Sequence, residues 1–152
     1  MRAAKQGSDL VARAHMMSAA AMGATAFQKA LGGIHALSHP VGALYDTHHG
    51  LTNAVFMPYV LAFNRPAIED RIARLAAYLG LAPTFAAFLT WVLELRAEIG
   101  IPHTLAGLKV DDQQFGRMNR MAAKDPTAAG NPVPLNEAAC RRLYAGALMG
   151  KI

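Results

Sequence analysis

Hydrophobic positions recur along this chain at helical spacing, and no segment alternates apolar and polar residues with a period of two. After Pro66, for example, Ile68 and Ile72 fall on one face of a helix that should end at Gly80. Further helices are predicted for five ranges: 8–31, 50–63, 83–100, 110–124 and 136–149. The pattern therefore predicts an all-α bundle of about six to seven helices, forming a single helical domain over residues 1–152.

Prolines are predicted to divide the central helices. Because proline lacks an N–H group and clashes with the preceding turn, one helical piece should end near His39 and another should begin at Pro40. Pro58 lies inside the apolar run 50–63 and should kink it, and Pro66 should open a separate helix.

The chain has 152 residues, of which 53% are hydrophobic. This is enough for one hydrophobic core, and the chain is too short to form two domains. From Met16 to Gln28 the chain carries no charge, so this helix should be surrounded on most sides. The run is shorter than the roughly 18 apolar residues that predict a membrane span. The single cysteine, Cys140, excludes an internal disulfide, and the first residues lack the apolar segment of a signal peptide. We expect a soluble, cytoplasmic protein without a membrane partner.

The formal net charge of +5 raises the possibility of a small DNA-binding regulator. The fifteen Lys and Arg residues are spread thinly, however, and the longest grouping is a pair such as Arg141–Arg142. No aromatic residues alternate with them, and no nucleic-acid-binding motif is present. Only the net charge favours DNA binding, and no other feature of the sequence supports it. We therefore expect no nucleic-acid partner.

Four of the six histidines lie in the apolar stretch 31–63, where Asp46 is the only charged residue. Burying an unpaired polar group costs roughly 1–3 kcal/mol, so these rings need partners, and a metal ion is a common partner of neutral imidazole. His35 and His39 are one helical turn apart, which brings their Cβ atoms within about 5–6 Å. A hydrogen-bonded core histidine is the alternative, and HxxxH spacing by itself leaves both possibilities open.

The string GGIHALSHPVGALYDTHHGLTNAVFMPYVLAFN resembles the histidine signature of the iron-dependent (group III) alcohol dehydrogenases. Two later segments, GIPHTLAGLKV and DPTAAGNPVPL, are similar to C-terminal parts of the same family. The resemblance implies that His35 and His49 are metal ligands. It places His39 beside the nicotinamide cofactor and the substrate oxygen, as a catalytic and cofactor-binding residue. His48 stands where the family often has proline, and no role is assigned to it.

The resemblance also implies an oxidoreductase that uses a divalent metal, Fe²⁺ or Zn²⁺, and NAD(P) to interconvert small alcohols and aldehydes. Complete members of the family carry an N-terminal nucleotide-binding domain and an upstream Asp-x-x-x-His element that supplies two further ligands. This chain contains neither a GxGxxG motif nor that element. We therefore expect the C-terminal helical domain alone, with an incomplete metal site, no NAD site and no activity in isolation.

Two expectations concern partners. The uncharged helix and the histidine stretch should leave an apolar face exposed, and such faces usually bind partners. We therefore expect a homo-oligomer or a complex with a separately encoded nucleotide-binding half. The alternative function is a noncatalytic helical interaction or scaffold module derived from the same domain.

Overall fold

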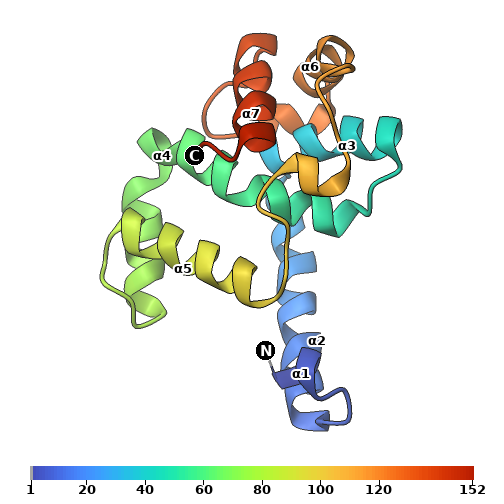
Figure 1. Ribbon diagram of the computed structural model, residues 1–152. Helices are drawn as coiled ribbons and strands as arrows, with labels where there is room; N and C mark the ends of the chain where they lie inside the picture. Colours follow the sequence, from blue (N-terminus) through green and yellow to red (C-terminus); the bar gives the residue numbers. More distant parts are fainter. Residues whose placement is uncertain (1) are drawn as a thin grey trace. The chain divides into compact units, whose positions relative to one another are not determined.

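The computed structural model describes residues 2–152, and within that range it contains helices and no strand (Figure 1). The prediction of an all-α fold is confirmed. The α-helices are α1 (Arg2–Lys5), α2 (Leu10–Ala26), α3 (Gly33–Tyr45), α4 (His49–Tyr78), α5 (Phe85–Glu98), α6 (Phe115–Ala123) and α7 (Glu137–Met149). Three short 3-10 helices accompany them: η1 (Phe27–Lys29), η2 (Leu105–Leu108) and η3 (Pro126–Gly130). No helix among the described residues is long and apolar enough to cross a membrane.

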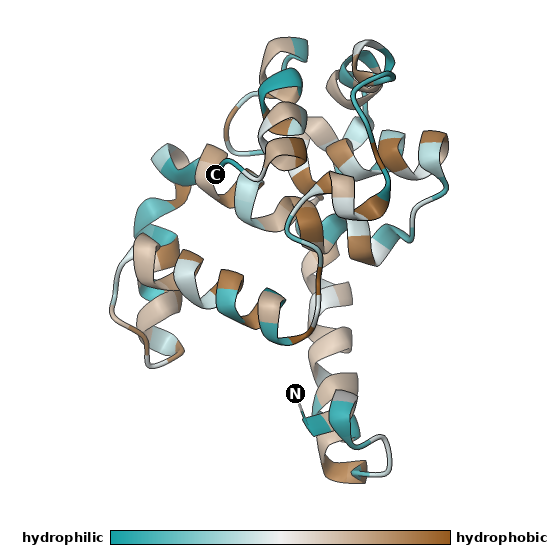
Figure 2. Cartoon of the chain, viewed as in Figure 1, coloured by the Kyte–Doolittle hydropathy of each residue, from teal (hydrophilic) through white to brown (hydrophobic). Residues whose placement is uncertain are grey.

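The chain divides between Leu31 and Gly32 into two compact units. In the first unit, Asp9 caps α2 by accepting a hydrogen bond from the Ala12 N–H at 2.9 Å, and Arg2 forms an ion pair with Asp9 at 2.7 Å. The brown and tan ribbon of α2 in Figure 2 reflects its apolar composition. Its large apolar side chains, and that of Phe27, are exposed: Leu10, Val11, Met16, Met17, Met22 and Phe27.

The core of the second unit lies where α3, α4, α6 and α7 pack together. Its largest fully buried side chains are Tyr144, Phe56, Leu37, Leu105 and Met118. The buried hydroxyl of Tyr144 donates a hydrogen bond of 2.7 Å to the Leu37 carbonyl, which ties α7 to α3. A smaller apolar cluster joins α4 to α5 through Ala76, Phe88 and Val92. Because α3 is anchored on its buried face, its other face is held in place for polar chemistry.

The predicted break at Pro40 is wrong, since α3 runs without interruption from Gly33 to Tyr45. An interior proline costs a helix about 3 kcal/mol, because it removes one backbone hydrogen bond and crowds the preceding turn. Here Pro40 is fully buried between Leu37 and Val41, which are also fully buried. Burial of this face offsets the local cost, and His35 and His39 consequently share one rigid helix.

The predicted separation of residues 50–63 from the helix beginning at Pro66 is also wrong. A single helix, α4, extends over 30 residues and contains both Pro58 and Pro66. Figure 1 shows this green ribbon changing direction along its length, as expected for a helix with internal prolines. The helix α4 packs against both α3 and α5.

The helix predicted to begin at Val110 begins instead at Phe115. The Asp111 carboxylate accepts hydrogen bonds from the Gln113 N–H at 3.1 Å and from the Tyr45 hydroxyl at 2.7 Å, which holds a turn before the helix. The segment 125–134 contains η3 and the side chain of Asn131, which contacts α3 and α4.

Candidate functional site

Three of the four histidines in the apolar stretch meet in one cluster. His35 and His39 project from α3, and His49 is the first residue of α4. The ring centroids of His35 and His49 are 5.2 Å apart, those of His39 and His49 are 5.5 Å apart, and those of His35 and His39 are 5.8 Å apart. Residues separated by a helix boundary are thus brought to one place by the packing of α3 on α4.

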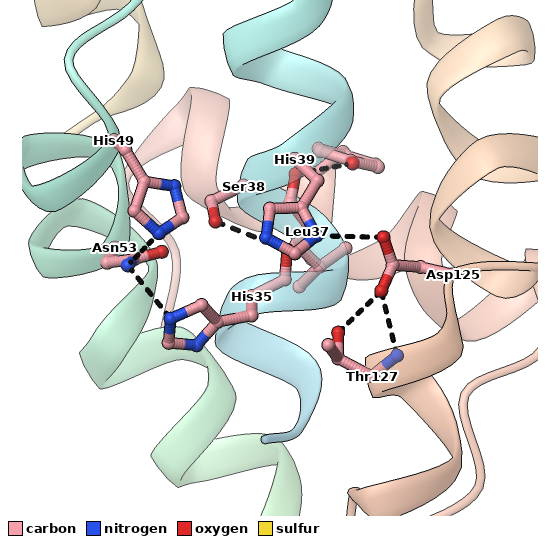
Figure 3. Close-up of polar contacts among 9 residues, drawn as sticks. His35, Leu37, Ser38, His39, His49, Asn53, Asp125 and Thr127 are labelled. Atoms are coloured by element: carbon pink, nitrogen blue, oxygen red, sulfur yellow. Dashed lines mark hydrogen bonds and ion pairs between the residues drawn. The ribbon is translucent and has the colours of Figure 1, made fainter. Parts of the chain in front are cut away.

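Asn53 lies between two of these rings, as Figure 3 shows. It follows His49 by one turn of α4, and its Nδ2 lies 3.0 Å from His49 Nε2 and 3.4 Å from His35 Nε2. The Nε2 atoms of the two imidazoles therefore face a common point. Two neutral imidazole nitrogens this close together could bind a cation in place of the amide contact.

His39 is paired with a carboxylate. Its Nδ1 lies 2.8 Å from Asp125 Oδ2, and the Asp125 side chain is 13% exposed. Asp125 Oδ1 accepts hydrogen bonds from the backbone N–H and the hydroxyl of Thr127, at 2.8 and 2.6 Å. A carboxylate only accepts hydrogen bonds, so His39 Nδ1 carries the proton and Nε2 remains for other chemistry.

The electrostatics of the cluster favour a neutral His35 and an ionised Asp125. Burial lowers the pKa of His35, and the neighbouring rings of His49 and His39 lower it further. Burial alone would raise the pKa of Asp125, but the hydrogen bonds from Thr127 and His39 outweigh it, so that the pKa lies below its usual range. Neutral imidazole is the form that coordinates a metal, and an ionised Asp125 holds His39 in orientation.

The two remaining histidines of the second unit have structural partners. His48 is the N-cap of α4, and its Nδ1 accepts a hydrogen bond from the Leu51 N–H at 3.3 Å. His103, although exposed, contacts Arg96 through Nδ1 and the Gly150 carbonyl through Nε2 at 3.3 Å. Its backbone carbonyl also accepts a hydrogen bond of 2.6 Å from Tyr59. His103 thus joins the segment after α5 to Arg96 and to the end of α7.

The start of α3 is fixed by an amide pair. Asn131 Oδ1 accepts hydrogen bonds from the Gly33 N–H at 3.0 Å and from Asn64 Nδ2 at 2.9 Å. Asn131 Nδ2 donates in return to Asn64 Oδ1 and to the Val133 carbonyl, both at 2.7 Å. These bonds join α3, α4 and the segment after η3, and they set the position of His35 two residues into its helix.

Within residues 2–152, no group of three or more His, Cys, Asp or Glu side chains is arranged to hold a metal ion. Two imidazole nitrogens nevertheless face one point, and the buried Asn53 Oδ1 beside them has no hydrogen-bond partner. Two neutral imidazole nitrogens are donors that suit a borderline divalent ion such as Zn²⁺ or Fe²⁺, and a tetrahedral site would need two further ligands.

Sequence analysis missed two residues of this cluster. Asn53 carries a recognisable signal, because it stands four residues after His49 and so shares its helix face. Asp125 carries a local signal only: the Asp-Pro-Thr sequence indicates a cap before a short helix. Its pairing with His39, 86 residues away in sequence, depends on the tertiary fold.

The chain is similar to known proteins over most of its length. A model of the Fe-containing alcohol dehydrogenase family, C-terminal, matches residues 1–148. The chain is 40% identical to 1,3-propanediol dehydrogenase from Citrobacter freundii over 139 residues, which cover 86% of this chain and 36% of that protein. It is 39% identical to 4-hydroxybutyrate dehydrogenase from Cupriavidus necator over 151 residues, covering 93% of this chain and 39% of that protein.

Solved structures give the same result for the fold. A crystal structure of 1,3-propanediol oxidoreductase matches with a TM-score of 0.89 and 33% identity, covering 97% of this chain and 41% of that chain. An alcohol dehydrogenase from Oenococcus oeni matches with a TM-score of 0.87 and 30% identity, covering 96% and 40%. The chain thus spans about two-fifths of the length of these relatives. On sequence and fold together, the chain belongs to the Fe-containing alcohol dehydrogenase family and corresponds to its C-terminal domain.

Proposed function

We propose that this chain supplies the metal-binding helical part of an NAD(P)-dependent, divalent-metal-dependent alcohol dehydrogenase. The observation that carries the proposal is the placement of His35 Nε2 and His49 Nε2, which face a common point from two different helices. His35 and His49 would hold the metal, Fe²⁺ or Zn²⁺. When bound, such an ion acts as a Lewis acid toward an alcohol or aldehyde oxygen.

His39 is proposed as the catalytic residue beside the substrate oxygen and the nicotinamide. Its Nδ1 is held by Asp125, so its Nε2 is the atom available to orient the substrate or relay its proton. Its ring is stacked on that of His49 at an interplanar angle of 15°, which keeps it next to the metal-binding pair. The His39 side chain is 40% exposed, so it is accessible to a substrate or cofactor.

Hydride transfer additionally needs a nucleotide-binding domain, and we propose that the helical domain acts together with one. Two imidazoles also leave a divalent ion incompletely neutralised, so they should bind it weakly without further ligands. We therefore expect the 152-residue chain to bind Zn²⁺ weakly and reversibly and to show no alcohol-dependent reduction of NAD(P) by itself. Such reduction by the purified chain would contradict this part of the proposal.

Calorimetric titration with Zn²⁺ tests the metal site directly. Replacing either ligand, in His35→Ala or His49→Ala, should weaken binding by at least about tenfold, because one of two nitrogen donors is lost. His15→Ala is the matched control, since His15 is exposed on α2 and should leave this affinity unchanged. Equal affinities of all four proteins would refute His35 and His49 as ligands.

The partner is proposed to be a second copy of the chain or a nucleotide-binding half encoded separately. The exposed apolar side chains of α2 support an association of this kind, since monomeric proteins seldom expose such patches. Light scattering at micromolar concentration should give a mass above 16.2 kDa for the chain alone or with such a half. Association without restored activity would favour the alternative function, a noncatalytic interaction or scaffold module.

A further inference from the structure

The guanidinium of Arg96 is buried without a carboxylate partner. Arg96 is 5% exposed, and among residues 2–152 it forms no ion pair with an Asp or Glu side chain. It instead donates a hydrogen bond of 3.1 Å to the Val55 carbonyl, contacts Nδ1 of His103 and lies 6.0 Å from the centroid of the Tyr59 ring. Burying a charge is costly unless neighbouring groups compensate for it, so Arg96 depends on these few contacts.

The two ring nitrogens of His103 contact groups of opposite hydrogen-bonding character. A guanidinium only donates hydrogen bonds, whereas a carbonyl oxygen only accepts them. Nδ1 therefore accepts from Arg96, and Nε2 donates to the Gly150 carbonyl at 3.3 Å. The ring also packs against the end of α7, since a Cβ atom added at Gly150 would lie 3.1 Å from His103 Cδ2. One tautomer of the neutral ring satisfies both contacts, and a flipped ring would place carbon atoms at both.

The groups around this ring would not stabilise a protonated imidazole. From α5, Arg96 contacts Nδ1, and from α4, Tyr59 donates its hydroxyl proton to the His103 backbone carbonyl at 2.6 Å. At the end of α7, the Gly150 carbonyl accepts from Nε2, and Lys151 follows it in sequence. Within the described part of the chain, no carboxylate forms an ion pair with His103. A proton added at Nδ1 would therefore face a guanidinium, with no paired negative charge to offset the repulsion between the two cations.

We propose that the contact between Arg96 and His103 is a pH-sensitive switch, which holds the end of α7 to α5 while the imidazole is neutral and releases it when the imidazole is protonated. The proton would bind at Nδ1, whose lone pair accepts from Arg96, so the contact and the protonated ring exclude each other. His103 is exposed, so solvent can deliver the proton. None of these groups belongs to the cluster of His35, His39 and His49, so the inference goes beyond the proposed function and does not depend on a metal.

The state of the ring is tested by ¹⁵N–¹H correlation spectroscopy of the histidine side chains in the metal-free chain at about pH 8, where an ordinary imidazole is neutral. His103 should show a protonated Nε2 and an unprotonated Nδ1. A protonated Nδ1 at this pH would overturn the inference, because such a ring cannot accept a hydrogen bond from Arg96.

The release itself is tested at the end of α7. The backbone N–H groups of Gly150 and Lys151 donate to the Gly146 carbonyl, so their hydrogen exchange reports on this end of the helix. Protection factors correct for the intrinsic effect of pH on exchange. Between about pH 8 and about pH 5 they should fall by about 2–10-fold, the factor expected for the loss of one hydrogen bond. Protection that does not change over this range would refute the switch.

His103→Asn separates this switch from other effects of pH, because its Oδ1 can accept from Arg96 but its side chain does not ionise. Its protection factors should be equal at both pH values, and a fall equal to that of the unsubstituted chain would count against the proposal. His15→Ala is the matched control, since His15 is exposed on α2, and it should show the full fall. If His103→Asn folds poorly, the ring signals of His103 in the unsubstituted chain decide: protection must fall over the same pH range in which this ring takes up its proton, and a different range would refute the proposal.

Discussion

Two histidine environments in the second unit differ in where their ring nitrogens point. The two ring nitrogens of His103 contact two separate groups, the Arg96 guanidinium and the Gly150 carbonyl. The Nε2 atoms of His35 and His49 instead contact one shared group, the amide nitrogen of Asn53. The first environment joins segments of the fold, whereas the second is the metal site proposed above.

The two environments also differ in how far their side chains are exposed to solvent. Arg96 is 5% exposed, and its guanidinium donates to the Val55 carbonyl at 3.1 Å and lies over the Tyr59 ring at 6.0 Å. These contacts join α5 to α4 and to the segment around His103. The His39 side chain is 40% exposed, so the histidine cluster is open to solvent. We refer to Arg96, Tyr59 and His103 as the Arg96 environment. Substitutions there should lower the stability of the fold, whereas substitutions in the histidine cluster should weaken metal binding.

The largest effect on stability is expected for Arg96→Ala. The substitution removes a buried side chain and its hydrogen bonds, which should lower the free energy of unfolding by roughly 3 kcal/mol. Urea unfolding followed by circular dichroism measures this quantity. Arg74→Ala, at an exposed position of α4, is the control and should change it by less than about 0.5 kcal/mol. A loss below about 1 kcal/mol for Arg96→Ala would show that this environment is not structural.

A smaller effect is expected at Gly33, where the frame of the histidine cluster begins. A Cβ atom there would lie 2.9 Å from Asn131 Oδ1 and 3.1 Å from Leu135 Cδ1. Gly33→Ala should lower the free energy of unfolding by roughly 1–2 kcal/mol, because the clash exceeds the gain in helix propensity. Gly116→Ala on α6 is the control, since its nearest such contact is 3.8 Å, and it should be neutral or stabilising in the same urea titration. If Gly33→Ala instead stabilised the protein, the Asn131 side chain would be able to move away from the added methyl group at little cost.

The comparison between the two environments is sharpest for the histidines themselves. His103→Ala should cost roughly 1–2 kcal/mol of unfolding free energy, because Arg96 and the Gly150 carbonyl lose a partner. His49→Ala should cost less than about 0.5 kcal/mol, since His49 is exposed at the start of α4. Thermal and urea unfolding of both variants, together with Zn²⁺ titration, measures the contrast. Equal stability losses would remove the distinction drawn here.

The fold was predictable where local rules apply. Asp9 and Asn136, residue types that favour N-cap positions, cap α2 and α7 by accepting hydrogen bonds of 2.9 and 2.8 Å from the N–H groups of Ala12 and Ala139. The interruptions expected at Pro40 and Pro66 did not occur, because burial and packing outweigh the local cost of an interior proline. Local sequence reports that cost accurately, but it does not report the tertiary contacts that offset it.

The candidate site was predictable to a similar extent. The clustering of histidines in an apolar stretch, and the resemblance it carries, indicated His35, His39 and His49, and the structure brings these three together. The partners that orient them were not indicated. Asp125 reaches His39 only through the packing of η3 against α3, which no local pattern encodes.

The smallest expected effect concerns pH and Asp125. Its pKa in the folded state lies below the usual value, because the hydrogen bonds from Thr127 and His39 outweigh the effect of burial. The ionised carboxylate is therefore favoured by folding: its contribution to stability is complete above the unfolded pKa of about 3.9 and is lost as the pH falls through the folded value.

In the Asp125→Asn variant the side chain cannot ionise, so the stability of this variant should fall less steeply in the same acid range. Thermal unfolding of both proteins between about pH 2 and 6 measures the difference, and Asp112→Asn, at an exposed position, is the control. An acid limb of equal slope in Asp125→Asn and the unsubstituted chain would mean that the His39–Asp125 pair does not hold in solution, and His39 would then lose the contact that orients it.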